Sequence, residues 1–141
     1  NIKIKIIGNI NTFPASLKMK IKRVEKQSKN KKKIQVNMAL NYGSRQEILN
    51  SVKIIKEKKL SANKKNFEKY LYTNGIPDPD ILIRTGDTNR ISNFLIWQLV
   101  YTEIFFVKKM WPDFTKRDFF KIINKFKNIS RNFGGLNNGV K

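Results

Sequence analysis

Residues 77–106 read PDPDILIRTGDTNRISNFLIWQLVYTEIFF, and the pattern of this stretch decides the fold. The run ILIR at 81–84 is short and apolar, which is typical of a strand buried on both faces of a parallel sheet, and EIFFV at 103–107 predicts another strand. Between them, SNFLIWQLVY at 92–101 predicts a helix with Ser92 as its N-cap. A strand, a helix and a second strand in this order favour parallel pairing.

The rest of the chain continues this alternation. Apolar residues at every second position from Ile2 predict a strand that ends at Gly8, and IQVNMAL at 34–40 predicts a further strand. Helices are expected from Pro14, over 45–58, from Ser61 to Tyr72, and after a cap at Thr115. We therefore predict an α/β fold with a mostly parallel central sheet that is flanked by helices.

The 141-residue chain contains no cysteine and no histidine. It therefore has no disulfide, no thiol nucleophile and no imidazole base or ligand. Any metal would be held by oxygen atoms, which favours Mg²⁺, Ca²⁺ or Mn²⁺. The amino terminus lacks the long apolar run of a signal peptide, and the apolar segment at 91–107 is too short and too polar to span a membrane.

The net charge of +20 has two interpretations. One is a polyanionic partner, such as nucleic acid, phosphates or an anionic membrane surface. The other is biased composition, because only six of the 30 basic residues are arginine. Since phosphate recognition usually places arginine at defined positions, the few arginines carry more information than the many lysines.

Arg84 and Arg90 are the most informative of these arginines. Ligands of parallel α/β sheets bind beyond the carboxyl ends of the strands, where Arg84, Arg90 and Ser92 are expected. The same rim should hold Asn9, the turn at 41–43 and Arg45. Two guanidinium groups, a hydroxyl and a helix N-terminus form a site for a phosphate or diphosphate. The alternative is that both arginines pair with surface aspartates at positions 78, 80 or 87.

Glu103 is the only acid inside a long apolar run. A buried carboxylate is paired, protonated or bound to a metal. One interpretation is a structural ion pair with Arg84 or Arg90. The other is an Mg²⁺ ligand, since Mg²⁺ often binds one or two carboxylates together with substrate phosphates.

These residues resemble the signature of the cis-prenyltransferases, specifically of undecaprenyl diphosphate synthase. The resemblance rests on five motifs: PDILIRTGDTNRISNFLIWQLVYTEIFF at 79–106, WPDF at 111–114, IKIIGN…FP at 4–14, LNYGSR at 40–45 and RNFGG at 131–135. It implies the α/β fold of that family and extends over nearly the whole chain.

The resemblance also implies an activity and its site. Members transfer isopentenyl units from isopentenyl diphosphate to an allylic prenyl diphosphate with cis geometry, giving a long polyprenyl (undecaprenyl) diphosphate carrier for cell-wall synthesis. Arg84, Arg90, Ile91 and Ser92 would bind the diphosphate of isopentenyl diphosphate, and Glu103 would bind Mg²⁺. A homodimer is implied, and the enzyme would be cytoplasmic with transient contact at a membrane surface and no nucleic-acid partner.

The chain departs from the family pattern at several positions. In the loop after residues 81–84, Thr88 and Asn89 stand where the family has an acid followed by Gln or His, and Asp87 takes a glycine position. Ser44 replaces the second glycine of the turn at 41–45. Asn132 replaces an arginine of the tail motif. The resemblance implies that the family arginine at that last position reaches a substrate of the partner subunit, a contact that Asn132 would lack.

The family motif that carries the catalytic aspartate has no match in this chain. We expect that motif and the first strands of the sheet upstream of Asn1, so residues 1–133 would be the C-terminal portion of a single domain, with residues 134–141 as a flexible tail. The isolated chain should not catalyse, and the exposed edge of its sheet should be a site of association. The alternatives are a non-catalytic subunit or truncated remnant of such an enzyme and a basic nucleic-acid-binding module.

Overall fold

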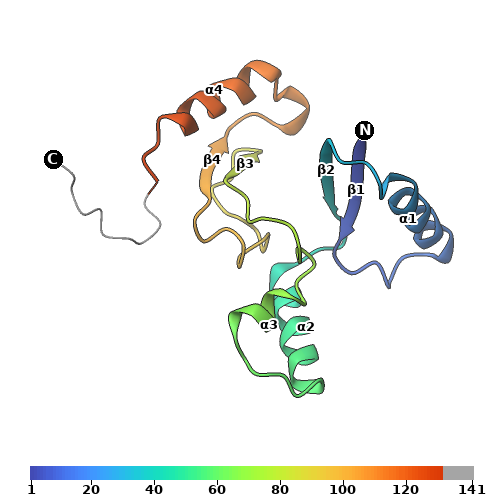
Figure 1. Ribbon diagram of the computed structural model, residues 1–141. Coiled ribbons are helices and arrows are strands. Elements are labelled where there is room, and N and C mark those ends of the chain that lie inside the picture. Colours follow the sequence, from blue (N-terminus) through green and yellow to red (C-terminus); the bar gives the residue numbers. More distant parts are fainter. Residues whose placement is uncertain (132–141) are drawn as a thin grey trace. The chain divides into compact units, whose positions relative to one another are not determined.

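The computed structural model describes residues 1–131, and its strands and helices alternate along the chain (Figure 1). The elements are β1 (Ile2–Ile7), α1 (Ala15–Ser28), β2 (Ile34–Ala39), α2 (Ser44–Glu57), α3 (Lys64–Glu68), β3 (Ile81–Thr85), β4 (Glu103–Val107), the 3-10 turn η1 (Trp111–Asp113) and α4 (Lys116–Lys127). They form two compact units. Unit 1 comprises Asn1–Pro77 and Asn93–Trp97, and unit 2 comprises Asp78–Ser92 and the chain from Gln98 onward.

Unit 1 contains a two-stranded parallel sheet of β1 and β2. The register runs from Ile2 opposite Ile34 to Ile7 opposite Ala39. Helix α1 lies beside β1, on the side away from β2 (Figure 1). The turns that follow the two strands meet, because the side-chain amide of Asn41 donates to the carbonyl oxygen of Asn9 at 2.9 Å. The predicted proximity of these two turns is therefore confirmed.

Helices α2 and α3 complete unit 1. Helix α2 matches the predicted span to within a residue at each end. The predicted helix from Ser61 to Tyr72 is shorter than expected, because only Lys64–Glu68 is helical. Its N-cap is Asn63 rather than Ser61, since the Asn63 side chain accepts a hydrogen bond from the Asn66 backbone at 2.9 Å.

Unit 2 contains a second parallel pair, β3 and β4. Ile81 lies opposite Glu103 and Thr85 lies opposite Val107. The predicted parallel α/β architecture is confirmed, although the described strands form two sheets of two strands. The prediction that residues 81–84 are buried on both faces is wrong, because every residue of β3 is only half-buried.

The predicted helix over 92–101 is also wrong. The segment is a series of turns in which Ser92, Asn93 and Leu95 have φ angles of 48°, 61° and 46°. These left-handed values are incompatible with a right-handed helix. Hydrogen bonds that join Asn93 and Ile96 to the start of α2 hold the segment in this conformation.

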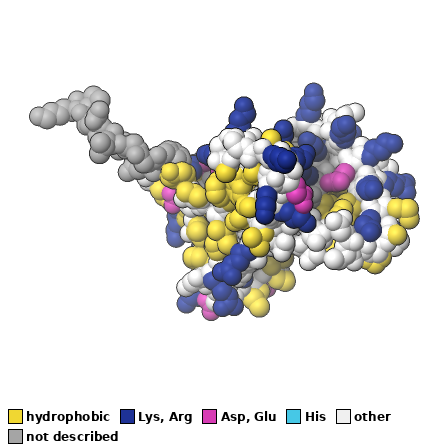
Figure 2. Space-filling view, turned by 90° about the horizontal axis from the view of Figure 1, so that it is seen from below, with side chains coloured by type: hydrophobic (Ala, Val, Ile, Leu, Met, Phe, Trp, Pro, Cys, Tyr) yellow, Lys and Arg dark blue, Asp and Glu magenta, His cyan; other side chains and the backbone are white. Residues whose placement is uncertain are grey.

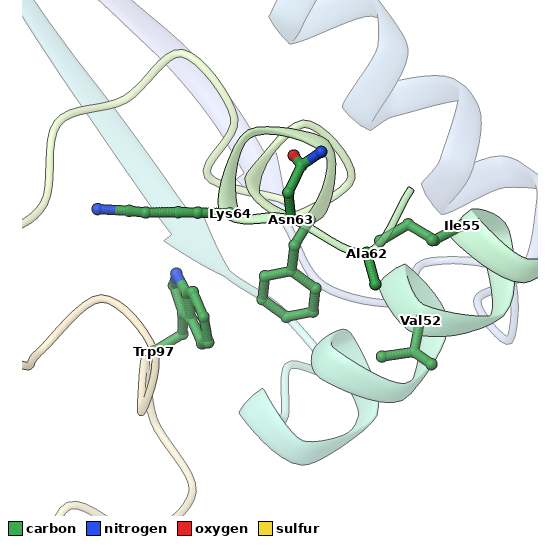
Figure 3. Close-up of a pocket in the computed structure, with 7 residues that line it drawn as sticks. Val52, Ile55, Ala62, Asn63, Lys64 and Trp97 are labelled. Carbon is green, nitrogen blue, oxygen red and sulfur yellow. The ribbon is translucent and has the colours of Figure 1, made fainter. Parts of the chain in front are cut away.

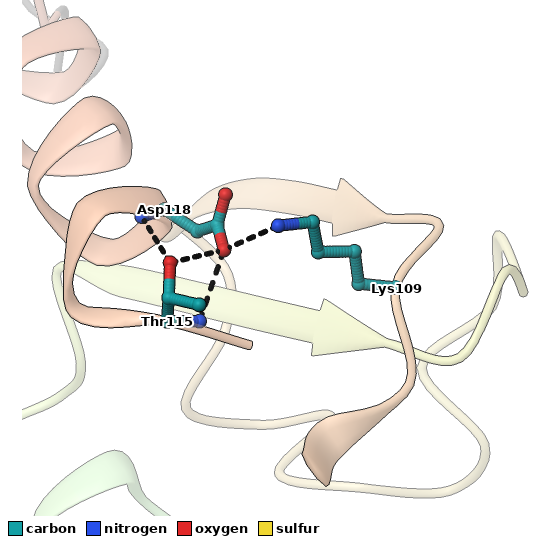
Figure 4. Close-up of polar contacts among 3 residues, drawn as sticks. All are labelled: Lys109, Thr115 and Asp118. Atoms are coloured by element: carbon teal, nitrogen blue, oxygen red, sulfur yellow. Dashed lines mark hydrogen bonds and ion pairs between the residues drawn. The ribbon is translucent and has the colours of Figure 1, made fainter. Parts of the chain in front are cut away.

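Helix α4 begins at the predicted cap. The Thr115 hydroxyl accepts from the Asp118 backbone at 3.3 Å, and the Asp118 carboxylate accepts from the Thr115 backbone at 2.9 Å (Figure 4). This is a capping box. Lys109, which follows β4, pairs with the same carboxylate at 2.8 Å and ties the strand end to the helix start. Together these contacts hold the pKa of Asp118 well below its usual range.

Few large apolar side chains are buried. Within the described residues the buried ones are Ile7, Ile21, Ile55, Leu71, Leu99 and Ile122. Many others are exposed, and Figure 2 shows hydrophobic patches between basic side chains that are spread across the visible face. No helix in the described part of the chain is long and apolar enough to cross a membrane.

Candidate functional site

Arg84 occupies the penultimate position of β3, opposite Phe106 of β4. Its side chain is half-buried, and its Nε donates to the Thr88 hydroxyl oxygen at 3.1 Å. This bond uses one of the five guanidinium N–H groups, so the terminal nitrogens remain available for an anion. Thr88 therefore orients Arg84 from the position where the family pattern has an acid.

The loop that follows β3 carries the other predicted anion ligands. Arg90 and Ser92 are exposed and Ile91 is half-buried. The loop turns through left-handed φ angles at Gly86, Asp87 and Ser92, a geometry that glycine tolerates and other residues adopt only when their surroundings hold it. Arg84, Arg90, Ile91 and Ser92 thus belong to one β3–loop segment of unit 2.

The described residues contain no ion pair between either arginine and an aspartate. Asp80 instead pairs with Arg131, whose guanidinium approaches its carboxylate at 2.6 Å and also donates to the Tyr101 carbonyl at 3.0 Å. The alternative in which Arg84 and Arg90 pair with neighbouring aspartates is therefore wrong for this part of the chain. Two guanidinium groups without a carboxylate partner favour an external anion.

Glu103 begins β4 and is half-buried rather than deeply buried. Its carboxylate makes no hydrogen bond or ion pair with another residue of the described range 1–131, so the structural pair with Arg84 or Arg90 is absent there. Side chains alternate between the two faces of a sheet, so Glu103 shares a face with Ile81, and Arg84 lies on the opposite face. Glu103 and Arg84 are therefore not brought together.

The carboxylate oxygens of Glu103 are ligands of the type that a hard divalent cation such as Mg²⁺ prefers. The described residues hold no group of three or more acids that could bind a metal. Residues 1–131 would therefore supply fewer than three protein ligands. Further ligands would come from water, from substrate phosphates or from residues beyond this range.

The N-terminus of α2 is closed by the segment that follows Ser92. The Ser44 and Arg45 backbone N–H groups donate to the backbone and side-chain oxygens of Asn93 at 2.8 and 2.9 Å. The Ser44 hydroxyl is fully buried and accepts from the Ile96 backbone at 3.0 Å. This helix terminus is thus satisfied by protein groups and offers no free N–H pair to an anion at these two positions.

Glu47 is a buried acid that the sequence did not single out. Its side chain is 1% exposed, and it accepts hydrogen bonds from the Tyr42 hydroxyl at 2.5 Å and the Tyr72 backbone at 2.6 Å. Burial and the neighbouring carboxylate raise the pKa of Tyr42. In the sequence, Glu47 is recognisable only as an acid in the first turn of a predicted helix. Exposed acids also occupy this position, so it gives no sign of burial.

Unit 1 also has an apolar pocket of about 350 Å³ between α2 and α3 (Figure 3). It is lined by Val52, Ile55, Ala62, Asn63, Lys64, Phe67 and Trp97. The Trp97 indole donates to Glu68 at 3.2 Å, and its ring lies 4.4 Å from that of Phe67 between centroids. The pocket contains none of the predicted anion ligands.

Parallel strand pairs with an arginine-bearing loop after β3 define a parallel α/β protein with a candidate anion site. Residues 1–134 match the family model described as “Putative undecaprenyl diphosphate synthase”. The chain belongs to this prenyltransferase family.

Individual relatives agree with this assignment. Isoprenyl transferase of Thermotoga maritima is 41% identical over 98% of this chain, and that of Fusobacterium nucleatum is 43% identical over 97%. A crystal structure of a probable undecaprenyl diphosphate synthase from Campylobacter jejuni matches 95% of the chain with a TM-score of 0.87 and 37% identity. Lavandulyl diphosphate synthase from Lavandula x intermedia, solved in complex with dimethylallyl diphosphate, matches 95% with a TM-score of 0.88 and 31% identity.

The match covers only part of each relative's chain. The chain spans 61% and 60% of the length of the two isoprenyl transferases and 64% and 61% of the two solved chains. About two fifths of each relative therefore has no counterpart in this sequence.

Proposed function

We propose that this chain supplies the isopentenyl diphosphate site of a cis-prenyltransferase. The observation that carries the proposal is that Arg84 and Arg90 follow one another on the β3–loop segment with no carboxylate partner in the described residues. Arginine pairs bidentately with phosphate oxygens, and two arginines offset the charge of a diphosphate. The Ser92 hydroxyl would donate a hydrogen bond to a further diphosphate oxygen. Ile91 would contact the ligand beside it through its backbone and its apolar side chain.

The proposed reaction extends an allylic prenyl diphosphate by one isopentenyl unit in each cycle. The C–O bond of the allylic diphosphate breaks and inorganic diphosphate leaves with the electron pair. The double bond of isopentenyl diphosphate attacks the allylic carbon, and a proton of the isopentenyl unit passes to a base or to water as the new cis double bond forms. Arg84, Arg90 and Ser92 would hold the diphosphate of the attacking molecule in place. Their contribution is positioning and charge neutralisation, which need neither histidine nor cysteine.

Mg²⁺ is the proposed cofactor, with Glu103 as a ligand. When bound, it would neutralise diphosphate oxygens. Because Glu103 lies on the face of the β3–β4 pair opposite Arg84, its role would be separate from that of Arg84. The proposed product is a long polyprenyl diphosphate, of the undecaprenyl type that carries cell-wall precursors, made by a cytoplasmic homodimer with transient contact at a membrane surface.

The isolated chain is proposed to bind isopentenyl diphosphate without turning it over, because the family motif with the catalytic aspartate has no match in it. A non-catalytic subunit is the second candidate function. It is favoured by the departure at Thr88, which places a neutral hydroxyl beside Arg84 where the family pattern has an acid. Adding the part of a relative's chain that this sequence does not match distinguishes the two, since only the first candidate should then give product.

Isothermal titration with isopentenyl diphosphate tests the proposed site. Arg84→Ala and Arg90→Ala should each weaken binding about tenfold or more, because a charge-assisted hydrogen bond contributes ~1.5–3 kcal/mol. Arg23→Ala is the matched control, since Arg23 is an exposed arginine on α1 and its loss changes net charge by the same amount. Equal losses in all three variants would mean that the anion is attracted by overall charge, and the proposal would fail.

A further inference from the structure

Arg131 connects the starts of both strands of unit 2. Its guanidinium donates to the Asp80 carboxylate at 2.6 Å through one terminal nitrogen and to the Tyr101 carbonyl oxygen at 3.0 Å through the other. Asp80 directly precedes β3, and Tyr101 lies two residues before β4 begins at Glu103. Because both bonds come from one planar group, they fix the two strand starts relative to each other.

A third hydrogen bond links the same two strand starts. The Glu103 backbone N–H donates to the Asp80 carbonyl oxygen at 3.0 Å. Asp80 is thus held by Arg131 through its side chain and by Glu103 through its backbone. Since the chain from Tyr101 to Glu103 completes the path, the three bonds form a closed ring. Glu103, the proposed metal ligand, is a member of this ring.

The ring lies where strand pairing alone restrains Glu103 least. Glu103 and Ile81 form the first pair of the β3–β4 register. A first pair at the end of a two-stranded sheet opens more easily than the pairs that follow it. The Thr102 hydroxyl adds a bond to the Pro79 carbonyl oxygen at 2.6 Å. These contacts therefore restrain the end of the strand pair that carries the Glu103 carboxylate.

Arg131 is itself held in place. Its side chain is 21% exposed, and its guanidinium lies 5.4 Å from the centre of the Phe126 ring on α4. An arginine that packs over an aromatic ring and donates to two acceptors is restricted to few rotamers. The pair differs in this from Lys53–Glu57 on α2, whose side chains are 74% and 61% exposed. Arg131 can therefore support the strand starts as a rigid group.

We propose that Arg131 is a positioning residue for Glu103. Its contacts with Asp80 and Tyr101 hold the start of β4, so that the Glu103 carboxylate is preorganised for a divalent cation. In this role Arg131 acts through the two strand starts and contacts neither cation nor substrate. The inference rests on the proposed function, in which Glu103 is a metal ligand.

Hydrogen exchange at single amides tests the positioning step on the full 141-residue chain. Arg131→Met removes the guanidinium and keeps an unbranched side chain beside Phe126. The Glu103 amide should then exchange about tenfold faster or more, whereas the Phe105 amide, further along β4, should stay within about twofold. A general loss of stability would speed both amides by the same factor, and that result would overturn the proposal.

Mn²⁺ is the metal probe, because it takes the same oxygen ligands as Mg²⁺ and broadens the NMR signals of nearby nuclei. In the unchanged chain, Mn²⁺ should broaden the Glu103 signals saturably. In Arg131→Met, the Mn²⁺ concentration that gives half of this effect should rise about threefold or more. If Glu103 is not broadened in the unchanged chain, the metal role fails and the inference fails with it. Equal broadening in both proteins would refute the positioning role alone.

Lys109→Met is the matched control. It removes a different ion pair of unit 2, in which Lys109 contacts Asp118 at 2.8 Å beyond the other end of β4 (Figure 4). The urea midpoint should fall, while the exchange of the Glu103 amide and its Mn²⁺ response should stay within about twofold of the unchanged chain. Changes as large as those in Arg131→Met would show that any loss of stability in unit 2 disturbs Glu103, and would overturn the proposal.

Asp80→Asn is a second test variant that applies even if Arg131→Met does not fold. It removes the charge of the Arg131 pair and keeps the Asp80 carbonyl that accepts from Glu103. Both the amide exchange and the Mn²⁺ response of Glu103 should change in the same direction as in Arg131→Met. No change in either measurement would contradict a positioning role for the pair.

Discussion

Arg84 and Glu103 lie on opposite faces of the β3–β4 pair, because Glu103 is in register with Ile81 and Arg84 is in register with Phe106. They are also three residues apart along the strands, which corresponds to about 10 Å. The two side chains therefore cannot both contact one anion that is bound on a single face of the β3–β4 strand pair. The diphosphate role proposed for Arg84 and the metal role proposed for Glu103 are therefore separable by mutation.

The first prediction separates these roles. Without Mg²⁺, Glu103→Gln should bind isopentenyl diphosphate within about twofold of the unchanged chain, whereas Arg84→Ala should lose about tenfold or more. Adding Mg²⁺ should change binding by the unchanged chain more than binding by Glu103→Gln. Titration calorimetry at fixed ionic strength measures both effects. If Glu103→Gln loses as much affinity for isopentenyl diphosphate as Arg84→Ala does when Mg²⁺ is absent, the carboxylate belongs to the anion site and the separation of roles is contradicted.

The second prediction concerns the hydroxyl that orients Arg84. Thr88→Val removes the acceptor of the Arg84 Nε bond while keeping the side-chain shape. Affinity for isopentenyl diphosphate should fall about two- to tenfold, since a neutral hydrogen bond contributes ~0.5–1.5 kcal/mol. Thr88→Ser keeps the hydroxyl and should bind nearly as well as the unchanged chain. Identical affinities of the Val and Ser variants would show that Thr88 does not orient the guanidinium.

The third prediction concerns the cap that Asn93 provides to α2 across 48 residues of sequence. Asn93→Ala removes the acceptor of the Arg45 N–H and places alanine at a φ of 61°. Unfolding in urea should show a loss of about 1–2 kcal/mol, which combines a lost cap with backbone strain. Asn93→Asp keeps the acceptor oxygen and should recover most of the loss. An unchanged urea midpoint in Asn93→Ala would contradict a capping role.

The fourth prediction is a pH dependence from Asp118. Its folded pKa lies below the ordinary value of 3.8, so the carboxylate contributes stability that is complete above pH 3.8 and is lost as pH falls through the lower folded value. The urea midpoint of the unchanged chain should therefore fall more steeply below pH 3.8 than that of Asp118→Asn, which cannot titrate. Parallel curves for the two proteins in this acid range would show that the contact with Lys109 and Thr115 does not stabilise the fold.

The sequence predicted elements whose cause is local. The strand that begins at Ile2, the helix at 44–57 and the helix cap at Thr115 all depend on residues within a few positions of each other, and all are confirmed. The helix predicted over 92–101 failed because its apolar spacing was outweighed by bonds to Ser44 and Arg45, which are distant in sequence. Local pattern carries no information about such long-range caps.

The candidate site divides in the same way. That Arg84 and Arg90 belong to one strand and its following loop could be predicted from apolar runs and turn residues. The register that puts Glu103 opposite Ile81 could not, since a shift of one residue would move its side chain to the other face. Glu47 was missed because its partners are the Tyr42 hydroxyl and the backbone of Tyr72, which is distant in sequence. Nothing in the neighbouring residues distinguishes it from an exposed helix acid.

The most direct measurement is an NMR titration of the arginine side chains with isopentenyl diphosphate. The chain has six arginines, and each Nε–H signal can be assigned by single substitution to lysine. We expect saturable shifts of the Arg84 and Arg90 signals at the same ligand concentration, whereas the Arg23 and Arg117 signals should shift little. Uniform shifts of all the arginine signals, weakening together as salt is added, would contradict a diphosphate site on the loop after β3.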